Sequence, residues 1–257
     1  MPERTKVAVL GARGRMGTTV VDAVSSAPDL ELSCALDLGD PLDSIVTSGA
    51  QVLVDFTSPD SVIDNITFAV EHGITCVVGT SGFTPDRIAE VHAIVDRHPG
   101  AGVFIAPNFG VGAVLMMQFA RLAAPFFESA EIIEMHHPGK VDAPSGTALH
   151  TAATIADARG DRGPAPDNTR TQDHDARGRS VEGIPVHAVR LSGLVAHQEI
   201  LFGSPGELLT IRHDSLDRGS FMPGVLLAIR EMSRRSGVIV GLENFLGLGS
   251  ATDPATS

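Results

Sequence analysis

Two histidines, a lysine and a Ser-Gly-Thr turn lie close together between His136 and Thr147. Imidazole and ammonium groups exchange protons near neutral pH, the ammonium group most readily where water is excluded. Apolar residues precede this segment and a helical pattern follows it, so we expect it to connect a strand to a helix. The segment therefore predicts a proton-transfer site with His136 and Lys140 as its proton donors.

The Ser-Gly-Thr turn predicts an anion site at a helix N-terminus. Ser145 can cap the helix, which leaves the N–H groups of Gly146 and Thr147 and the Thr147 hydroxyl for a carboxylate. A cap alone would explain Ser145 but not the two histidines and Lys140 beside it. A carboxylate-bearing substrate would explain all of them.

No metal ion is expected in this segment. His136 and His137 are adjacent on a strand-like stretch and point to opposite faces, so they cannot easily share one ion. The sequence places no cysteine or acidic cluster beside them to supply further ligands.

A glycine-rich segment between Gly11 and Gly17 predicts a dinucleotide-binding turn. It joins a short apolar strand to a helix with the spacing G-x-x-G-x-x-G, not the commoner G-x-G-x-x-G. Gly11 permits a tight turn, Gly14 lets a pyrophosphate approach the backbone, and Gly17 lets the helix pack on the strand. Asp37 ends the next strand, where a carboxylate can bind the adenosine ribose. The strand–helix context and this acid disfavour the alternative of a glycine turn without a ligand.

Two further loops, Gly79-Thr80-Ser81 and Ala106-Pro107-Asn108-Phe109, also follow strand-like segments. Loops at the carboxyl ends of parallel strands are where ligands bind in such sheets. Taken alone, each is more often a plain turn.

Strand-like and helix-like segments alternate through residues 1–108, which predicts a parallel, doubly wound α/β sheet. The expected strands cover 7–10, 30–36, 51–56, 74–78 and 103–106, and the expected helices cover 15–26, 60–72 and 85–98.

The pattern changes near residue 109 and predicts a separate α+β part with an open mixed sheet. We expect a helix over 111–127 that Pro125 interrupts near its end, a strand over 130–137, a helix over 145–158 and a mobile loop over 159–182. Three strands at hairpin spacing (184–191, 195–202, 207–213), a helix over 220–235 and a frayed C-terminus complete the prediction.

The composition excludes several classes of protein. The 257 residues include 43% hydrophobic and 19% charged residues, enough apolar side chains for a buried core. A net charge of -12 disfavours nucleic acid and anionic membranes as partners, so an anionic ligand needs a local cationic pocket. The two cysteines lie in apolar runs, and no stretch has the length of a signal or membrane segment, so we expect a soluble protein of the cytoplasm.

The motif H-H-x-x-K-x-D-A-P-S-G-T, from His136 to Thr147, resembles the signature of the dihydrodipicolinate reductase (4-hydroxy-tetrahydrodipicolinate reductase) family. The resemblance covers nearly the whole chain and includes the G-x-x-G-R-M-G opening, the loops at 79–81 and 106–109, and Arg212-His213-Asp214-Ser215. It implies reduction of a cyclic dicarboxylate with NADH or NADPH in lysine and diaminopimelate biosynthesis.

The resemblance also implies a role for each matching residue. His136 would be the proton donor or acceptor, Lys140 a proton donor and His137 a substrate contact, while Gly146 and Thr147 would clamp a carboxylate. The cofactor would bind to Gly11, Ala12, Arg13, Gly14, Arg15 and Met16 at its pyrophosphate, to Asp37 at its adenosine ribose, and to Gly79, Thr80, Ser81, Ala106, Pro107, Asn108 and Phe109 on its nicotinamide side.

The implied architecture is a Rossmann domain over 1–108, completed by 219–257, with an α+β substrate domain inserted over 109–218. Family members are typically homotetramers joined through the sheet of the substrate domain. The chain crossings near residues 108 and 219 would then be hinges for closure around the substrate.

Two other functions would share part of this sequence pattern. A nicotinamide-dependent dehydrogenase for another amino acid or oxo-acid, such as homoserine or aspartate, would share the first domain but not the His-His to Ser-Gly-Thr segment. A catalytically silent dinucleotide-sensing module should lack one or more of His136, Lys140 and Thr147, and all three are present.

Overall fold

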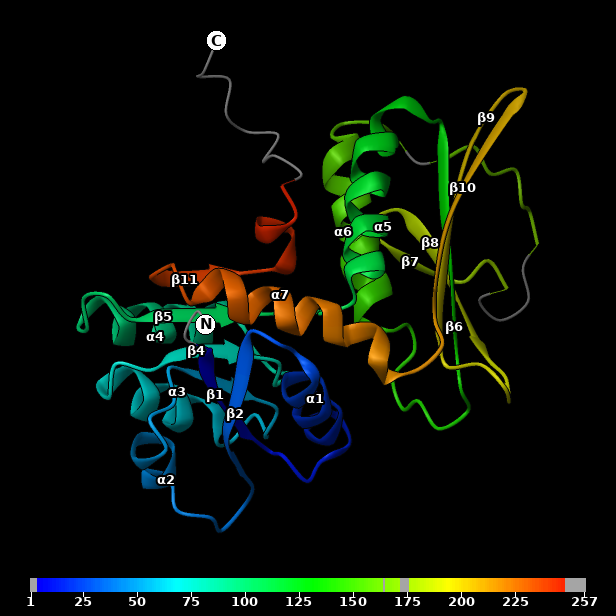
Figure 1. Ribbon diagram of the computed structural model, residues 1–257. Helices are drawn as coiled ribbons and strands as arrows, with labels where there is room; N and C mark the ends of the chain where they lie inside the picture. The colour runs from blue at the N-terminus through cyan, green and yellow to red at the C-terminus, as the bar shows by residue number, and fades with distance from the viewer. Residues whose placement is uncertain (1–3, 164, 172–175, 248–257) are drawn as a thin grey trace. The chain divides into compact units, whose positions relative to one another are not determined.

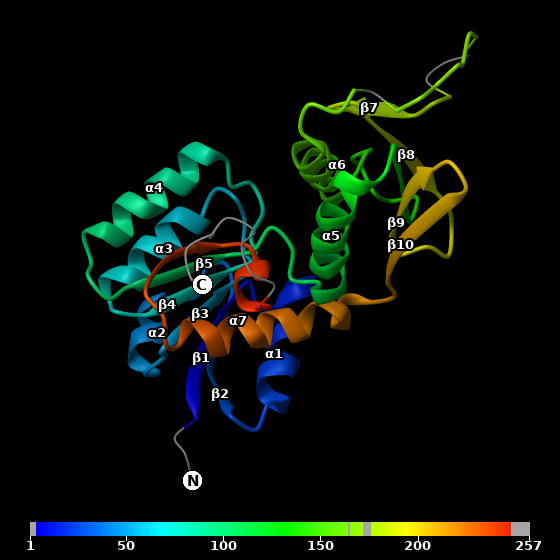
Figure 2. The same ribbon diagram turned by 90° about the horizontal axis from the view of Figure 1, so that it is seen from above.

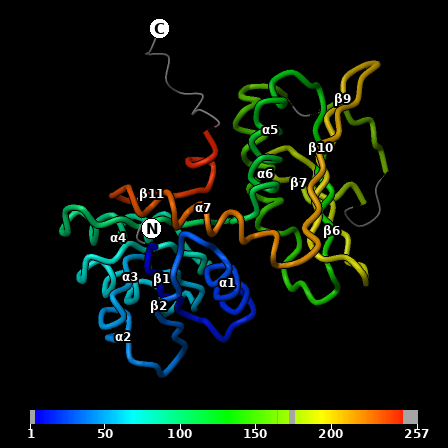
Figure 3. Tube along the Cα trace, viewed as in Figure 1, coloured from blue at the N-terminus to red at the C-terminus, as the bar shows by residue number. Residues whose placement is uncertain are grey.

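The structure is a computed structural model that describes residues 4–163, 165–171 and 176–247. It divides into two compact units, which we call unit 1 (Met1–Val111 with Phe221–Ser257) and unit 2 (Gly112–Ser220). The chain leaves unit 1 after its fifth strand and returns to it before its last long helix, as the tube in Figure 3 shows.

Unit 1 is built on a six-stranded parallel sheet (Figure 1). Its strands are β1 (Thr5–Leu10), β2 (Leu30–Leu36), β3 (Val52–Asp55), β4 (Thr75–Val78), β5 (Gly102–Ile105) and β11 (Gly237–Val240). They lie in the order β11-β5-β4-β3-β1-β2, and every neighbouring pair is parallel. This order confirms the predicted doubly wound sheet.

Helices cover both faces of this sheet (Figure 2). One face carries α2 (Asp43–Thr47), α3 (Val62–Glu71) and α4 (Pro85–Asp96), and the other carries α1 (Arg15–Ser26) and α7 (Met222–Met232). Thr84 caps α4 and Pro85 occupies its first turn, where the missing N–H of proline costs no helical hydrogen bond.

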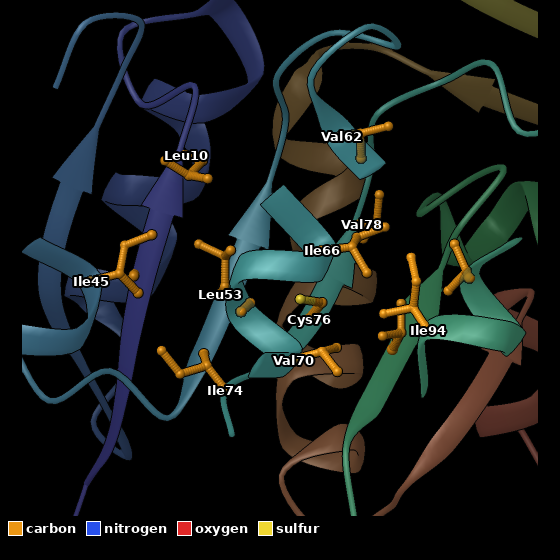
Figure 4. Packing of buried hydrophobic residues seen from close by; sticks show 14 of the residues in the cluster. Leu10, Ile45, Leu53, Val62, Ile66, Val70, Ile74, Cys76, Val78 and Ile94 are labelled. Carbon is orange, nitrogen blue, oxygen red and sulfur yellow. The ribbon is translucent and has the colours of Figure 1, made fainter. Parts of the chain in front are cut away.

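The core of unit 1 explains why its strands consist almost entirely of apolar residues. Leu53 and Cys76 on the sheet pack with Ile66 of α3 and Ile94 of α4 (Figure 4). Burying one such aliphatic side chain contributes about 1.5–3 kcal/mol to the free energy of folding. Cys34 and Cys76 are both free thiols, and burial raises the pKa of the Cys76 thiol, so it stays protonated.

Unit 2 is built on a five-stranded mixed sheet with the order β10-β9-β6-β8-β7. Its elements are α5 (Val111–Ala123), η1 (Ala124–Phe126), β6 (Ser129–His136), α6 (Gly146–Arg159), β7 (Arg179–Val181), β8 (Ile184–Arg190), β9 (Ala196–Ser204), β10 (Glu207–Ser215) and η2 (Arg218–Phe221). Helix α6 packs on β6, β7 and β8. The predicted open mixed sheet is therefore confirmed.

The predicted hairpin between the segments 184–191 and 195–202 is wrong. Strand β6 lies between β8 and β9 and pairs in parallel with β8 and antiparallel with β9. The chain between β8 and β9 is short enough for a hairpin, but β6 has the apolar residues needed at the centre of the sheet. Only β9 and β10 form the expected antiparallel neighbours.

Short elements were also missed or misplaced. Strand β7 lies at the end of the stretch predicted as a mobile loop, and α2, β11 and η3 (Leu242–Phe245) were not predicted. The last helix is α7, shorter at both ends than the expected 220–235. The predicted frayed C-terminus, and part of the predicted mobile loop, lie outside the described residues.

Candidate active site

A cavity of about 440 Å³ lies in unit 1 at the carboxyl ends of β1, β2 and β3. Three loops line it, and they bring together Leu10, Gly11, Gly14, Asp37, Leu38, Gly39, Asp40, Leu42, Phe56, Thr57, Ser58, Ser61 and Asn65. The glycine turn and Asp37, which are far apart in the sequence, therefore share one cavity, as the dinucleotide motif predicts.

Two glycines of this turn tolerate no side chain. Gly11 has a φ of +75°, and a Cβ there would lie 2.4 Å from the Phe56 carbonyl oxygen. A Cβ on Gly17 would lie 1.9 Å from the Gly11 carbonyl oxygen. Helix α1 begins right after Gly14, which has no side chain to cap it, so its first N–H groups suit an anionic ligand. Ala12 is buried, Arg13 and Arg15 are exposed, and Met16 is half-buried.

The carboxylate of Asp37 is held by backbone N–H groups. The N–H of Leu38 donates to Oδ1 at 2.8 Å, and the N–H of Arg13 donates to Oδ2 at 2.7 Å. These two hydrogen bonds, that of Leu38 first, lower the pKa of Asp37 below its usual value. The Arg13 guanidinium lies 3.0 Å from the Asp40 carboxylate. Asp37 therefore presents a fixed negative charge at the edge of the cavity.

The loops after β4 and β5 lie at the same end of the sheet but do not line this cavity. Thr80 is buried and donates its hydroxyl to Asp55 at 2.6 Å. Ser81 and Pro107 are exposed, and Asn108 is half-buried and accepts from the Gly110 N–H at 2.8 Å.

Aromatic packing holds these two loops in place. Phe109 is buried, with its ring centroid 5.7 Å from that of Phe56, and Ala106 is buried beside the end of β5. A Cβ on Gly79 would lie 2.2 Å from the Phe56 ring. The Phe56 ring therefore links the predicted loops to the cavity.

In unit 2, β6 carries the candidate proton donor at its last residue. Residues 130, 132 and 134 of this strand are buried, and His136 continues the same alternation at the end of the strand. The side chain of His136 is 14% exposed, so the ring is largely buried but not closed off from solvent.

The buried carboxylate of Glu134 is the centre of a hydrogen-bond network. Its Oε2 lies 2.6 Å from His136 Nδ1 and 2.8 Å from Arg190 Nη1. Its Oε1 accepts from Arg190 Nη2 at 2.8 Å and from the Ser145 N–H at 3.0 Å. Arg190 faces His136 because β6 and β8 pair at these two residues. Glu134 and Arg190 were not predicted from the sequence.

The pKa of His136 is lowered from its ordinary value. Burial is the largest cause, and the positive charges of Lys140 and Arg190 act in the same direction. The hydrogen bond and negative charge of Glu134 oppose them. The lowered pKa means that this imidazole gives up a proton more readily than a free imidazole does.

Lys140 and the N-terminus of α6 are joined by one carboxylate. Lys140 Nζ donates to Asp142 Oδ1 at 2.7 Å. The pKa of Asp142 is lowered, chiefly by this hydrogen bond and to a lesser extent by a backbone hydrogen bond from Gly146. Lys140 therefore already binds one carboxylate close to the start of α6.

Ser145 is the N-cap of α6, as predicted. Its hydroxyl oxygen accepts from the Ala148 N–H at 3.1 Å. Gly146 is exposed, and a Cβ there would meet no atom within 4 Å, so a ligand can reach the backbone at this point. Thr147 is half-buried in the first turn of α6, and His137 is exposed beyond the end of β6.

Sequence profiles of one family match both units. The profile described as "Dihydrodipicolinate reductase, N-terminus" matches residues 5–109, and "Dihydrodipicolinate reductase, C-terminus" matches residues 112–246. The chain belongs to the dihydrodipicolinate reductase family.

Individual members of the reductase family agree over nearly the full length. The chain is 57% identical over 243 residues to the 4-hydroxy-tetrahydrodipicolinate reductase of Mycobacterium marinum and 56% identical over 247 residues to that of Streptomyces coelicolor. Each alignment covers 95% of this chain and 99% of the relative. A solved structure, dipicolinate-bound dihydrodipicolinate reductase from Paenisporosarcina sp. TG-14, is 40% identical with a TM-score of 0.85 and covers 95% of this chain and 100% of that chain.

The structure of this reductase brings together only part of the predicted set of site residues. His136, Lys140, Gly146 and Thr147 lie on one connected segment of unit 2. Gly11, Gly14 and Asp37 line the cavity of unit 1, whereas Ala12, Arg13, Arg15 and Met16 do not. Phe56, Thr57 and Ser58 also line it and were not predicted. These three follow the end of a strand, so the rule that selected the loops at 79 and 106 could have found them.

Proposed function

We propose that this chain reduces 4-hydroxy-tetrahydrodipicolinate, after loss of water as dihydrodipicolinate, to tetrahydrodipicolinate in lysine and diaminopimelate biosynthesis. One observation carries the proposal: the imidazole of His136, held by Glu134, lies on the same segment as Lys140, whose ammonium group binds a carboxylate. A substrate that needs both a proton and carboxylate recognition matches this arrangement. Membership of the reductase family supports the same assignment.

Unit 1 is proposed to bind the nicotinamide cofactor, which supplies a hydride when it is bound. The cavity and the glycine turn suit a dinucleotide. Gly11 and Gly17 have no room for a side chain, and the cavity reaches the start of α1, where free N–H groups can bind phosphate. The residues from Gly11 to Met16 would hold the pyrophosphate and Asp37 the adenosine ribose. The loops at 79–81 and 106–109 would adjoin the nicotinamide.

Unit 2 is proposed to bind the substrate and to supply the proton. A hydride added to a conjugated cyclic imine leaves an enamine, and the neighbouring carbon then takes a proton. His136 would donate it, with Lys140 as a further proton source, and His137 would contact the ring substituents. Lys140, Gly146 and Thr147 would hold a carboxylate, which needs such local partners in a chain with a net charge of -12.

A coupled assay tests this function. The purified chain is mixed with NADH and the aldolase-type synthase that makes the cyclic substrate from pyruvate and aspartate semialdehyde. We expect NADH oxidation only when the synthase and both of its substrates are present. Homoserine and aspartate, tested with NAD⁺, should give no reduction. Activity with either of them and none in the coupled assay would favour the alternative dehydrogenase.

The reductase should use NADH at least as well as NADPH. Asp37 is followed by Leu38-Gly39-Asp40, without a cation for a 2′-phosphate, and its own negative charge repels one. Arg13 and Arg15 are exposed and could turn toward a phosphate, so NADPH should still work.

Asp37→Ala and Asp37→Asn should both shift the ratio of kcat/KM values toward NADPH. Asp22→Asn, an exposed change elsewhere in unit 1, should leave the ratio unchanged. A strong preference of the wild-type enzyme for NADPH would show that Arg13 and Arg15, and not Asp37, determine which cofactor is bound. If the ratio of kcat/KM values is unchanged in both Asp37 variants, Asp37 does not contact the cofactor and is only a solvated residue at the end of a strand.

Pyridine-2,6-dicarboxylate should compete with the substrate, and Thr147→Ala should weaken the binding of both. The reason is that each carries carboxylates for the first turn of α6. We expect KM and the inhibition constant to rise together by about tenfold, because Thr147→Ala removes one hydrogen bond to a charged carboxylate. Thr154→Ala, which removes an exposed hydroxyl later in α6, is the control. Noncompetitive inhibition would show that the substrate carboxylate does not bind at the start of α6.

We further propose a cytoplasmic homotetramer joined through the sheet of unit 2. Leu208 and Val189 lie on this sheet and are 70% and 37% exposed, and Leu191, Val195 and Leu216 beside it are also exposed. Such apolar side chains favour a partner surface. Among the described residues, no helix is long and apolar enough to cross a membrane.

A further inference from the structure

We infer that Glu134 and Arg190 are positioning residues that keep a hydrogen on His136 Nδ1 and so leave Nε2 as the atom that exchanges a proton with the substrate. This inference deepens the proposed function and rests on it for the role of the proton. The state of the imidazole itself can be tested without any substrate.

The geometry fixes which atom donates. Glu134 is fully buried, and its two oxygens face four donors: His136 Nδ1, two nitrogens of Arg190 and the Ser145 N–H. A carboxylate only accepts hydrogen bonds, so the 2.6 Å contact requires the hydrogen to be on Nδ1. In the neutral ring Nε2 then has no hydrogen and can take one.

Glu134 stays ionised in spite of its burial. Burial by itself would raise its pKa, but hydrogen bonds from Arg190 and His136 outweigh burial, and the pKa is lowered. The two parallel bonds from Arg190 are the strong, bidentate kind. Arg190 therefore preserves the charge that orients His136.

The same network reaches the carboxylate-binding segment. Arg190 Nη2 also donates to the Asp142 carbonyl oxygen at 2.7 Å, and Glu134 accepts from the N–H of Ser145, the cap of α6. One buried carboxylate thus fixes the imidazole, the end of the Lys140 loop and the start of α6. The network therefore holds His136 and the carboxylate-binding segment in a fixed relation, as a proton donor aligned with its substrate requires.

A purely structural buried ion pair is the competing explanation, and unit 2 contains a matched control for it. Glu131, on the same strand, accepts from His187 Nε2 at 2.8 Å and from Arg177. This network has the same three residue types, but Glu131 lies an odd number of residues from Glu134 and so points to the other face of β6. Changing it should disturb the strand without touching His136.

Glu134→Gln is the informative substitution because an amide has one acceptor oxygen for four donors. We expect kcat to fall about 10- to 100-fold, the size of effect known for a metal-bound histidine that loses the carboxylate orienting it. Glu134→Asp, which keeps the charge, should recover part of this loss. Glu131→Gln should stay within about twofold of the wild-type kcat, since Glu131 and its partners lie on the face of β6 opposite to His136. Circular dichroism and thermal melts should show that each variant is folded.

The pH profile gives a readout that a structural role would not move. The charged groups acting on His136 are Glu134, Lys140 and Arg190, and only Glu134 favours the protonated ring. Loss of Glu134 therefore lowers the pKa of His136 further. Because the protonated ring is the active acid, kcat/KM should begin to fall at a lower pH in Glu134→Gln than in the wild type.

Nitrogen-15 NMR of histidine-labelled enzyme decides the inference, with His136→Gln used to assign the signals. We expect the wild-type His136 signals to show the Nδ1–H tautomer above its pKa, and Glu134→Gln to change the tautomer. An Nε2–H tautomer in the wild type would overturn the inference, even if Glu134→Gln failed to fold. Equal losses of kcat in Glu131→Gln and Glu134→Gln would also overturn it. A correct tautomer in an enzyme inactive in the coupled assay would instead contradict the proposed function.

Discussion

His136→Gln should lower the turnover number by about two to four orders of magnitude, the usual contribution of a positioned general acid. Glutamine keeps a polar side chain at the end of β6 but has no proton to give near neutral pH. Affinity for NADH should stay near the wild-type value, because the glycine turn belongs to unit 1. Steady-state kinetics and titration of NADH binding by fluorescence measure the two quantities separately.

His150→Gln is the control for this substitution. His150 is exposed on α6, a few residues beyond the proposed clamp, and its side chain is not part of the Glu134 network. It should keep nearly full turnover. A loss of less than about tenfold in His136→Gln would show that His136 is not the proton donor.

Lys140→Ala should lower kcat/KM by about two orders of magnitude or more, with both kcat and KM affected. The change removes a proton source and also a charged hydrogen-bond partner, which is worth about 1.5–3 kcal/mol. In the structure this ammonium group already binds one carboxylate, that of Asp142, at 2.7 Å. Initial rates over a range of substrate concentrations separate the two effects.

Lys140→Arg serves as the comparison, because it keeps the positive charge but remains protonated at every accessible pH. It should retain much of the affinity and lose turnover. If KM is unchanged in Lys140→Ala, Lys140 does not bind the substrate carboxylate.

Much of unit 1 could be predicted because its signals are local. Apolar strands alternate with helices, and α4 begins at a capping threonine followed by proline. Helix α2, with five residues, is too short for a clear periodicity. Strand β11 pairs with β5 from far along the chain, and such pairing leaves no local pattern.

The strand order of unit 2 could not be predicted for the same reason. The turn after β8 has the length and composition of a hairpin loop, but β6 enters between β8 and β9. Loop chemistry reports which residues turn, not which strands become neighbours. The choice depends on covering apolar side chains such as Ile132 and Ile200, which are fully buried.

In the candidate site, too, the local features could be predicted and the long-range contacts could not. The residues from His136 to Thr147 are contiguous, so their types and spacing predict a proton donor beside an anion site. Arg190 lies 56 residues from Glu134 and meets it only through the pairing of β6 with β8. Glu134 lies just before the motif, but its role requires knowing that it is buried. The contact between Asp142 and Lys140 likewise depends on the path of the loop.

We expect this chain to transfer a hydride from the nicotinamide to a cyclic dicarboxylate. The most direct measurement uses NADH that carries deuterium at both hydrogens of the nicotinamide C4, together with the product of the aldolase-type synthase. Mass spectrometry of the reduced cyclic product should show one added deuterium. A product without deuterium, or label retained in the cofactor while the cyclic substrate is unchanged, would contradict the account.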